Sequence, residues 1–361
     1  MRQGLLGWCV AALVAAGSAQ ADDTLTIRGD HASTRAFARD AASLFKMKRG
    51  ASVRVEATGT IGALESVAHG EVDVVASARG GVDGVEAEQG LRYVPVAWDA
   101  LAVIVFPSNP VQAISLQQLQ DVLAGRIKDW QALGGKPGKI NLYAVATPMD
   151  GVEYSVRRLV LGAGTARTAA ERWYLNTERL EEAVTIDPAG LAVSLYSDVA
   201  DNKLLRTLAV EGVQPSPNTV QSGEYLLATP LYVVTRPDAA PGSTTAGRFV
   251  EYLDDAEVRK NMRAHHLIPW SEGRDVSEAV ASREAFLADR LGYAEKVVVQ
   301  LPPAPTPRKT APINPARLAQ SDVRHASATK LPAPKGAGLP RATAAASPDK
   351  AHECLEQALC T

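Results

Sequence analysis

The chain has 361 residues, of which 22% are charged and 46% hydrophobic, and its 38 basic and 40 acidic residues leave a formal net charge of -2. This composition excludes a disordered polyelectrolyte, a strongly basic nucleic-acid binder and a small disulfide scaffold. The length is enough for about two domains of roughly 150 residues, each with a hydrophobic core.

The N-terminal segment is typical of a secretory signal peptide over residues 1–21. Arg2 gives the charged start, residues 5–16 form a short apolar run, and the sequence AQA ending at Ala21 fits a small-x-small cleavage site. A membrane anchor would need a longer apolar run to cross about 30 Å of hydrocarbon. We therefore expect cleavage near Ala21 and a mature chain in the periplasm or secreted.

In the body of the chain, short strand-like runs alternate with segments of helical periodicity, which favours an α/β architecture. The expected strands are residues 25–29, 52–57, 72–77, 101–105, 140–146, 190–197, 205–211 and 228–236. The expected helices are residues 33–47, 61–70, 115–125, 246–264 and 275–290. The first elements form two β-α-β units, for which parallel strands and right-handed crossovers are expected.

Three loops follow the carboxyl ends of expected strands and lead into helices, at residues 29–34, 58–62 and 77–79. In such loops, backbone N–H groups, Ser or Thr hydroxyls and the positive end of a helix can surround an anion. The candidate ligand residues of these loops are Ser33, Thr34, Thr60, Ser77 and Arg79. The alternative, that the hydroxyls are ordinary helix caps, stays open for each loop.

Motifs between residues 58 and 270 add a more specific pattern. They are TGTIGAL (58–64), GEVDVVASAR (70–79), VPVAWDALAVIV (94–105), GRIKDW (125–130), LGG (133–135), SGEYLLATPLYVV (222–234) and HLIPW (266–270). In this order they resemble the periplasmic phosphate-binding proteins of ABC transporters, over about residues 25–270 and without the C-terminal tail.

The resemblance implies a two-lobed type II periplasmic binding protein fold, with a ligand cleft between lobes that two crossover strands join. It implies one lobe from residues 22–100 and 235–295, and a second lobe from residues 101–234. It also implies a solute-binding protein that captures a small anion between its lobes. Phosphate is the first expectation and another oxyanion or acidic metabolite the second, with an ABC transporter permease as partner.

The loop after residues 140–146 departs from the family pattern. There the phosphate binders carry an arginine followed by a Ser-Gly-Thr loop, which gives a charged fork and backbone donors to the oxyanion. This chain instead has TPMDGVEYS over residues 147–155, in which Asp150 and Glu153 would repel an anion. By position, Asp150 and Gly151 are the second-lobe candidates for ligand binding.

The departure leaves a second interpretation open, an envelope interaction or scaffold protein of the same fold with a non-phosphate or vestigial cleft. A hydrolase built on Asp150 and Glu153 is a third, but no nucleophile or base stands beside them in a recognisable motif. The sequence contains no Gly-x-Ser-x-Gly elbow, P-loop or His-Glu-x-x-His helix. We therefore expect no enzyme activity, no cofactor and no metal.

Other polar residues are expected to be structural. Asp99, beside Trp98 where the chain crosses between lobes, is expected to be a hinge or cap residue. Solvated faces or helix caps are expected at Arg157-Arg158, Glu181-Glu182 and Asp254-Asp255.

The last segment, residues 300–361, is expected to be a disordered, basic, Pro/Ala-rich tail. Residues 301–361 hold 10 of the 22 prolines and 14 alanines, a composition that cannot form its own core. Cys354 and Cys360 are the cysteines that remain after removal of the signal, and an oxidising compartment would permit a local disulfide between them. The tail is either a solvated spacer or a segment that reaches an envelope partner.

Overall fold

The structure, a computed structural model, describes residues 24–239 and 241–293. The expected signal peptide, the Pro/Ala-rich tail and both of its cysteines lie outside these residues. All the described residues belong to the first of the two units into which the chain divides, which spans residues 1–307.

One mixed sheet runs through both lobes. Its spatial order is β2 (Val53–Ala57), β1 (Leu25–Gly29), β3 (Val74–Ser77), β11 (Ala228–Thr235), β4 (Arg92–Val105), β8 (Gly190–Leu195), β6 (Asn141–Val145) and β7 (Arg172–Tyr174). Short strands β9 (Arg206–Thr207) and β12 (Ile268–Pro269) pair with β4, while β5 (Ala113–Ile114) pairs with β10 (Ala209–Val210). The parallel pairs of β1 with β2 and with β3 confirm the two expected β-α-β units.

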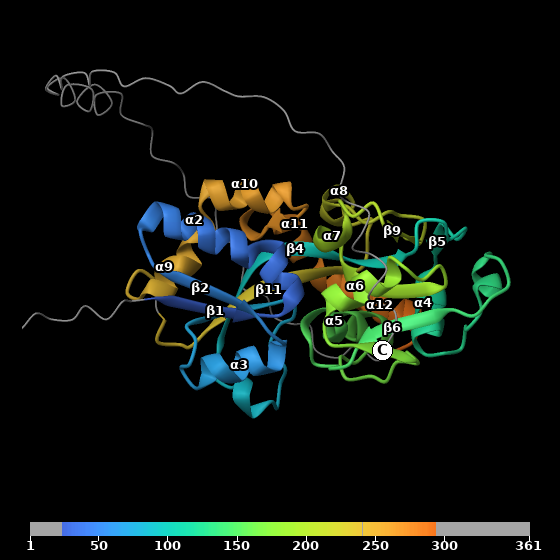
Figure 1. Ribbon diagram of the computed structural model, residues 1–361, viewed down its shortest axis with the longest axis horizontal. Helices are drawn as coiled ribbons and strands as arrows, with labels where there is room; N and C mark the ends of the chain where they lie inside the picture. Colours follow the sequence, from blue (N-terminus) through green and yellow to red (C-terminus); the bar gives the residue numbers. More distant parts are fainter. Residues whose placement is uncertain (1–23, 240, 294–361) are drawn as a thin grey trace, which may run out of the picture. The chain divides into compact units, whose positions relative to one another are not determined.

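Strand β4 is shared by the two lobes. Its residues 92–100 pair antiparallel with β11 in the first lobe, and residues 101–105 pair antiparallel with β8 in the second. The second crossing lies directly beside it, because the Leu101 amide donates to the Leu227 carbonyl at 2.7 Å, one residue before β11 begins. The expected pair of crossover strands is therefore present (Figure 1).

The first-lobe helices cover both faces of their strands. Segments α1 (His31–Ser33), η1 (Thr34–Ala38, a π-helical turn) and α2 (Arg39–Arg49) follow without a break, close to the expected 33–47. Phe37, Ala41 and Phe45 form the buried face of this helix. Together with α9 (Thr245–Tyr252) and α10 (Ala256–Ala264), α2 lies on one side of the strands, and α3 (Thr60–Ala68) lies on the other (Figure 1).

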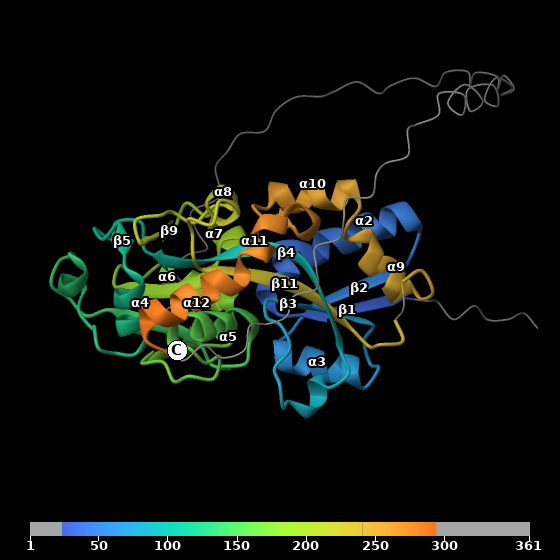
Figure 2. The ribbon, with the colours of Figure 1, turned by 180° about the vertical axis from the view of Figure 1, so that it is seen from behind.

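The second lobe surrounds β8, β6 and β7 with helices. These are α4 (Leu116–Leu123), α5 (Gly151–Leu161), α6 (Thr177–Val184), α7 (Tyr196–Val199) and α8 (Pro217–Gln221). The described part of the chain ends with α11 (Arg274–Glu278) and α12 (Val280–Leu291). Its short 3-10 turns are η2 (Glu86–Glu88), η3 (Trp130–Leu133) and η4 (Trp270–Glu272). Helix α12 packs on α4 and α5 of this lobe, although the sequence grouped residues 235–295 with the first lobe (Figure 2).

The structure confirms one expected helix start and divides two expected elements. The capping box of Ser115 and Gln118 begins α4 as expected. The expected helix 246–264 is two helices, because the Asp255 side chain accepts the Glu257 amide at 3.0 Å and starts α10 anew. The expected strand 205–211 is likewise the two short strands β9 and β10. Among the described residues, no helix combines the length and the apolarity needed to cross a membrane.

Asp99 lies in β4 beside the crossing and is 2% exposed. One of its oxygens accepts the Ala100 amide at 2.7 Å and the Ser197 amide at 3.3 Å. No cationic side chain of the described residues forms an ion pair with it. Because burial disfavours the charged form, the pKa of Asp99 rises to about 8 from 3.8. This carboxyl is therefore protonated in the folded protein over a pH range in which the unfolded chain has lost the proton.

The free energy of unfolding is expected to depend on pH through this carboxyl. Its raised pKa stabilises the folded state at low pH, and the stabilisation declines as the pH rises from about 4 to about 8. An Asp99→Asn variant is neutral throughout, so near pH 9 we expect it to be more stable than the parent by about 2 kcal/mol. Urea unfolding of both proteins at about pH 6 and pH 9 measures this. A parent protein with the same stability at both values would contradict the prediction.

Candidate ligand site at the junction of the lobes

Four loops meet where strands β1, β2, β3 and β6 end. The first lobe contributes Asp30, which caps α1, Thr60, which begins α3, and Ala78 after β3. The second lobe contributes Asp150 and Gly151 at the start of α5. The predicted ligand residues in the first lobe are all 1% exposed or less: Ser33, Thr34, Thr60, Ser77 and Arg79. The junction therefore gathers all three predicted first-lobe loops and the second-lobe loop.

Asp30 binds the donors of two predicted anion loops. Its Oδ1 accepts the Ser33 amide at 2.7 Å and the Ser33 hydroxyl at 2.8 Å. Its Oδ2 accepts the Ala78 amide at 2.8 Å. Thr34, the next predicted ligand residue, has a buried hydroxyl with no hydrogen-bond partner among the described residues. A carboxylate of the chain thus takes the place that the sequence assigned to a bound anion.

Asp150 does the same from the opposite lobe. Its Oδ1 accepts the Thr60 amide at 2.9 Å and the Thr60 hydroxyl at 2.7 Å. The Thr60 hydroxyl oxygen in turn accepts the Gly151 amide at 2.9 Å. These three hydrogen bonds join the second-lobe loop directly to the start of α3, so the chain's own groups hold the lobes together.

Gly151 is in close contact with the opposite lobe. A Cβ at this position would lie 2.6 Å from Asp30 Oδ2 and 2.8 Å from the Ala78 Cβ. Such distances are well inside van der Waals contact, so the glycine is required for the lobes to meet in this way.

The two carboxyl groups influence one another. Burial and the nearby charge of Asp150 raise the pKa of Asp30 to about 6, against the lowering effect of the Ser33 and Ala78 hydrogen bonds. Asp30 therefore gains a proton in mildly acidic solution, and the junction then loses one negative charge.

Ser77 and Arg79 lie at the junction but direct their polar groups elsewhere. The Ser77 hydroxyl donates to the Arg79 carbonyl at 2.8 Å and closes a local turn. The Arg79 guanidinium pairs with the buried Glu88 at 2.7 Å, and its Nε donates to the Met149 carbonyl at 2.8 Å. Glu88 thus neutralises the arginine that the sequence offered to the ligand, and Arg79 acts as a link between lobes.

Glu153, expected to repel an anion, faces its own lobe. Its Oε2 accepts the Val145 amide at 2.9 Å, and its other oxygen binds Arg157. Arg157 is 3% exposed, so the expectation of a solvated Arg157-Arg158 face is wrong for this residue. Of the two carboxylates in this loop, Asp150 is the one that meets the first lobe.

The sequence does not predict a second polar contact between the lobes. Arg35, in η1, donates to Asp198 at 2.7 Å and to Glu181 at 2.7 Å. Glu181 is 5% exposed, so the solvated face expected at Glu181-Glu182 is also wrong for its first residue. Burial and the charge of Asp198 raise the pKa of Glu181 to about 7. No local motif marks this contact, because its partners are separated by 146 residues or more.

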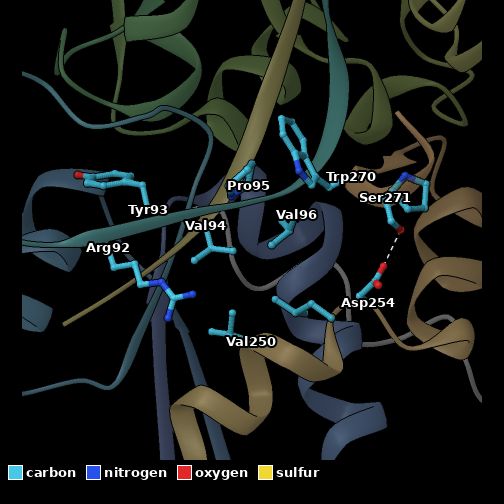
Figure 3. A pocket seen from close by; sticks show the side chains of 11 residues that line it. Arg92, Tyr93, Val94, Pro95, Val96, Val250, Asp254, Trp270 and Ser271 are labelled. Carbon is cyan, nitrogen blue, oxygen red and sulfur yellow. Dashed lines mark hydrogen bonds between the residues drawn. The ribbon is translucent and has the colours of Figure 1, made fainter. Parts of the chain in front are cut away.

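The larger cavities described here lie away from Asp30 and Asp150. A cavity of about 310 Å³ opens on the first lobe beside the start of β4, where Ser271 and Asp254 are hydrogen-bonded (Figure 3). None of the predicted ligand residues lines it. A cavity of about 30 Å³ beside Arg79 and Ser155 has room for water only. Within the described ranges, no three His, Cys, Asp or Glu side chains form a metal-binding group.

The sequence of this chain is similar to those of known proteins. Phosphate-binding protein PstS of Bacillus subtilis (strain 168) is 26% identical over 253 residues, which cover 69% of this chain and 81% of the relative. Protein SphX of Synechococcus elongatus is 29% identical over 232 residues, covering 58% of this chain and 67% of the relative.

Two solved structures share the fold. One is a phosphate ABC transporter substrate-binding protein from Clostridium perfringens with bound phosphate, at a TM-score of 0.60 and 21% identity, covering 68% of this chain and 99% of that one. The other is an ABC-type phosphate transport receptor from Vibrio cholerae, at a TM-score of 0.55 and 20% identity, with the same coverage of 68% and 99%. They confirm the expected two-lobed α/β fold. Residues 14–257 match the PBP superfamily domain, and the chain therefore belongs to the PBP superfamily.

Proposed function

We propose that this protein is an extracytoplasmic solute-binding protein that takes a phosphate-class anion at the junction of its lobes and works with an ABC transporter. The observation that most directly supports this function is that hydrogen-bond donors from four loops meet at the junction. The Ser33, Thr60 and Ala78 amides already bind carboxylate oxygens, and an oxyanion can use the same donors. Relatives named as phosphate-binding proteins agree with that ligand class.

The two carboxylates set the conditions for binding. An entering anion must displace Asp150 from Thr60 and lie close to Asp30, so their charges oppose it at neutral pH. Protonation of Asp30 below its pKa of about 6 removes one of these charges. A protonated carboxyl can also donate a hydrogen bond to an anion. We therefore propose that the protein binds its anion more tightly in mildly acidic solution.

Calorimetric titration with phosphate at about pH 5.5 and pH 7.5 tests this proposal. We expect a dissociation constant at least about threefold lower at the acidic pH, in line with the loss of one opposing charge. Sulfate carries no titrating proton in this range, so the same trend with sulfate would assign the effect to the protein. In Asp30→Asn the difference with sulfate is expected to disappear. A folded parent protein that binds neither anion at either pH would contradict the proposed function.

A second candidate function has its own supporting observation. Besides the Thr60 contacts, Ser155 donates to the Ala78 carbonyl at 2.9 Å and Arg79 to the Met149 carbonyl at 2.8 Å, so several groups of the chain itself join the lobes. Direct contacts of this kind would suit an envelope interaction protein that stays closed, with the tail as a further contact to a partner. Small-angle scattering separates the two: a solute-binding protein changes its radius of gyration with phosphate, and a permanently closed one does not.

A further inference from the structure

Arg283 is a buried cation that the junction does not use. It lies in α12 and is 7% exposed. Its Nε is buried without a hydrogen-bond partner, and the guanidinium forms no ion pair within the described part of the chain. The neighbouring Glu284 is paired with Arg158 at 2.9 Å, and its charge acts on Arg283 without a direct ion pair.

The Arg283 side chain is held in place by an aromatic ring. Its guanidinium carbon lies 5.3 Å from the ring centroid of Trp98, which also stacks on Trp270 at 5.3 Å. Burial lowers the pKa of Arg283 to about 10, so the group still carries its charge at neutral pH. A buried, charged guanidinium costs folding free energy unless an anion pairs with it and accepts its hydrogen bonds.

Arg283 is one of the residues that line a cavity of about 390 Å³. Its walls come from α8 and the turn that follows, and from α11 and α12. Val220, Leu226, Val276 and Ala279 give it apolar walls, Arg283 supplies a positive charge, and the exposed Asp275 lies on the same wall without pairing with Arg283. The volume is within the usual range for small-molecule sites. None of these residues contacts Asp30 or Asp150.

We propose that this cavity is a second ligand site, separate from the junction, and that it takes a small organic carboxylate. The planar guanidinium matches a carboxylate in a two-bond, fork-like pair. The apolar walls suit the body of such a ligand, and Gln221, Ser222 and Ser282 add polar groups to the lining. Arg283 connects the cavity to β4, because its guanidinium lies over the Trp98 ring.

Trp98 provides a reporter for the test. The full-length chain, purified after export, is labelled with 5-fluorotryptophan and titrated with sodium benzoate, with sodium chloride at matched ionic strength as the blank. The Trp98 resonance is assigned by its loss in Trp98→Phe. We expect it to shift saturably with benzoate, while the resonance of Trp130, which lies against Ala189 in the second lobe, stays unchanged.

Variants of α12 test the role of the guanidinium. Arg283→Met is expected to weaken benzoate binding at least about tenfold, as loss of a charge-assisted pair would. Arg283→Lys keeps the charge and the packing stem but lacks the fork, and is expected to weaken it about threefold. Arg290→Met, at an exposed position of the same helix, is the matched control and should bind as the parent does.

Three results would overturn the proposal. The first is an unchanged Trp98 resonance with benzoate, and the second is the parent's affinity in both Arg283→Lys and Arg283→Met. The third is a phosphate-induced shift of the Trp98 resonance that is as large as that with benzoate and that Arg283→Met abolishes, because it would exclude a site selective for a carboxylate on an apolar body.

Discussion

Replacing Asp150 with serine is expected to raise the affinity for phosphate at least about tenfold. The substitution removes the carboxylate that occupies the Thr60 amide and hydroxyl, and with it a negative charge that is 7% exposed. Two unit charges about 4 Å apart repel by about 4 kcal/mol at an effective dielectric constant of about 20, so tenfold is a conservative expectation. Calorimetric titration at about pH 7.5 measures the change.

The same variant should alter the shape of the protein. Loss of the Asp150 contact to Thr60 weakens closure, so we expect a larger radius of gyration without phosphate and the parent's value with it. Glu182→Ser is the control, because this second-lobe carboxylate has a 56% exposed side chain and pairs within its own helix, with Arg179. An unchanged or lower affinity in Asp150→Ser, with the parent's fold, would mean that the Thr60 donors do not serve an anion.

Replacing Glu88 with alanine is expected to destabilise the first lobe strongly. The change leaves the Arg79 guanidinium, 1% exposed, without its carboxylate, and it removes the partner of the Val82 amide. Loss of one member of a buried ion pair costs about 3–5 kcal/mol. We therefore expect a fall in Tm of about 6 °C or more for a protein of this size, measured by thermal unfolding.

Two variants control for this prediction. Glu182→Ala breaks the exposed pair with Arg179 and should change the free energy of unfolding by no more than about 0.5 kcal/mol. The double variant Arg79→Met with Glu88→Leu removes both charges and should recover much of the lost stability. If Glu88→Ala unfolded at the parent's temperature, the buried pair would not be a stabilising link.

Much of the fold could be predicted because it depends on local patterns. The apolar spacing of Phe37, Ala41 and Phe45 predicts a helix with one buried face, and Ser115 with Gln118 predicts where α4 begins. The succession of strand, loop and helix also predicts that three loops meet at one edge of the sheet. These features need only a few consecutive residues, so they can be read without a structure.

Local patterns could not predict which groups of the chain bind the hydrogen-bond donors at the junction. The bond between Asp150 and Thr60 joins residues 90 positions apart, and that between Arg35 and Glu181 joins residues 146 apart. Charged residues are usually exposed, so Glu181 and Arg157 were assigned to solvent, whereas buried partners from distant segments hold them inside. The sequence shows which donors a site has, but the groups that satisfy them depend on tertiary contacts.

The missing side chain at position 151 makes the closed arrangement sensitive to a single methyl group. A Cβ there would lie 2.6 Å from Asp30 Oδ2, so the methyl group of alanine would push the lobes apart. Larger side chains would separate them further. Substitutions of increasing side-chain size at this one position would therefore yield proteins whose lobes are held apart to different extents. Such a set separates the cost of closing the lobes from the strength of whatever binds between them.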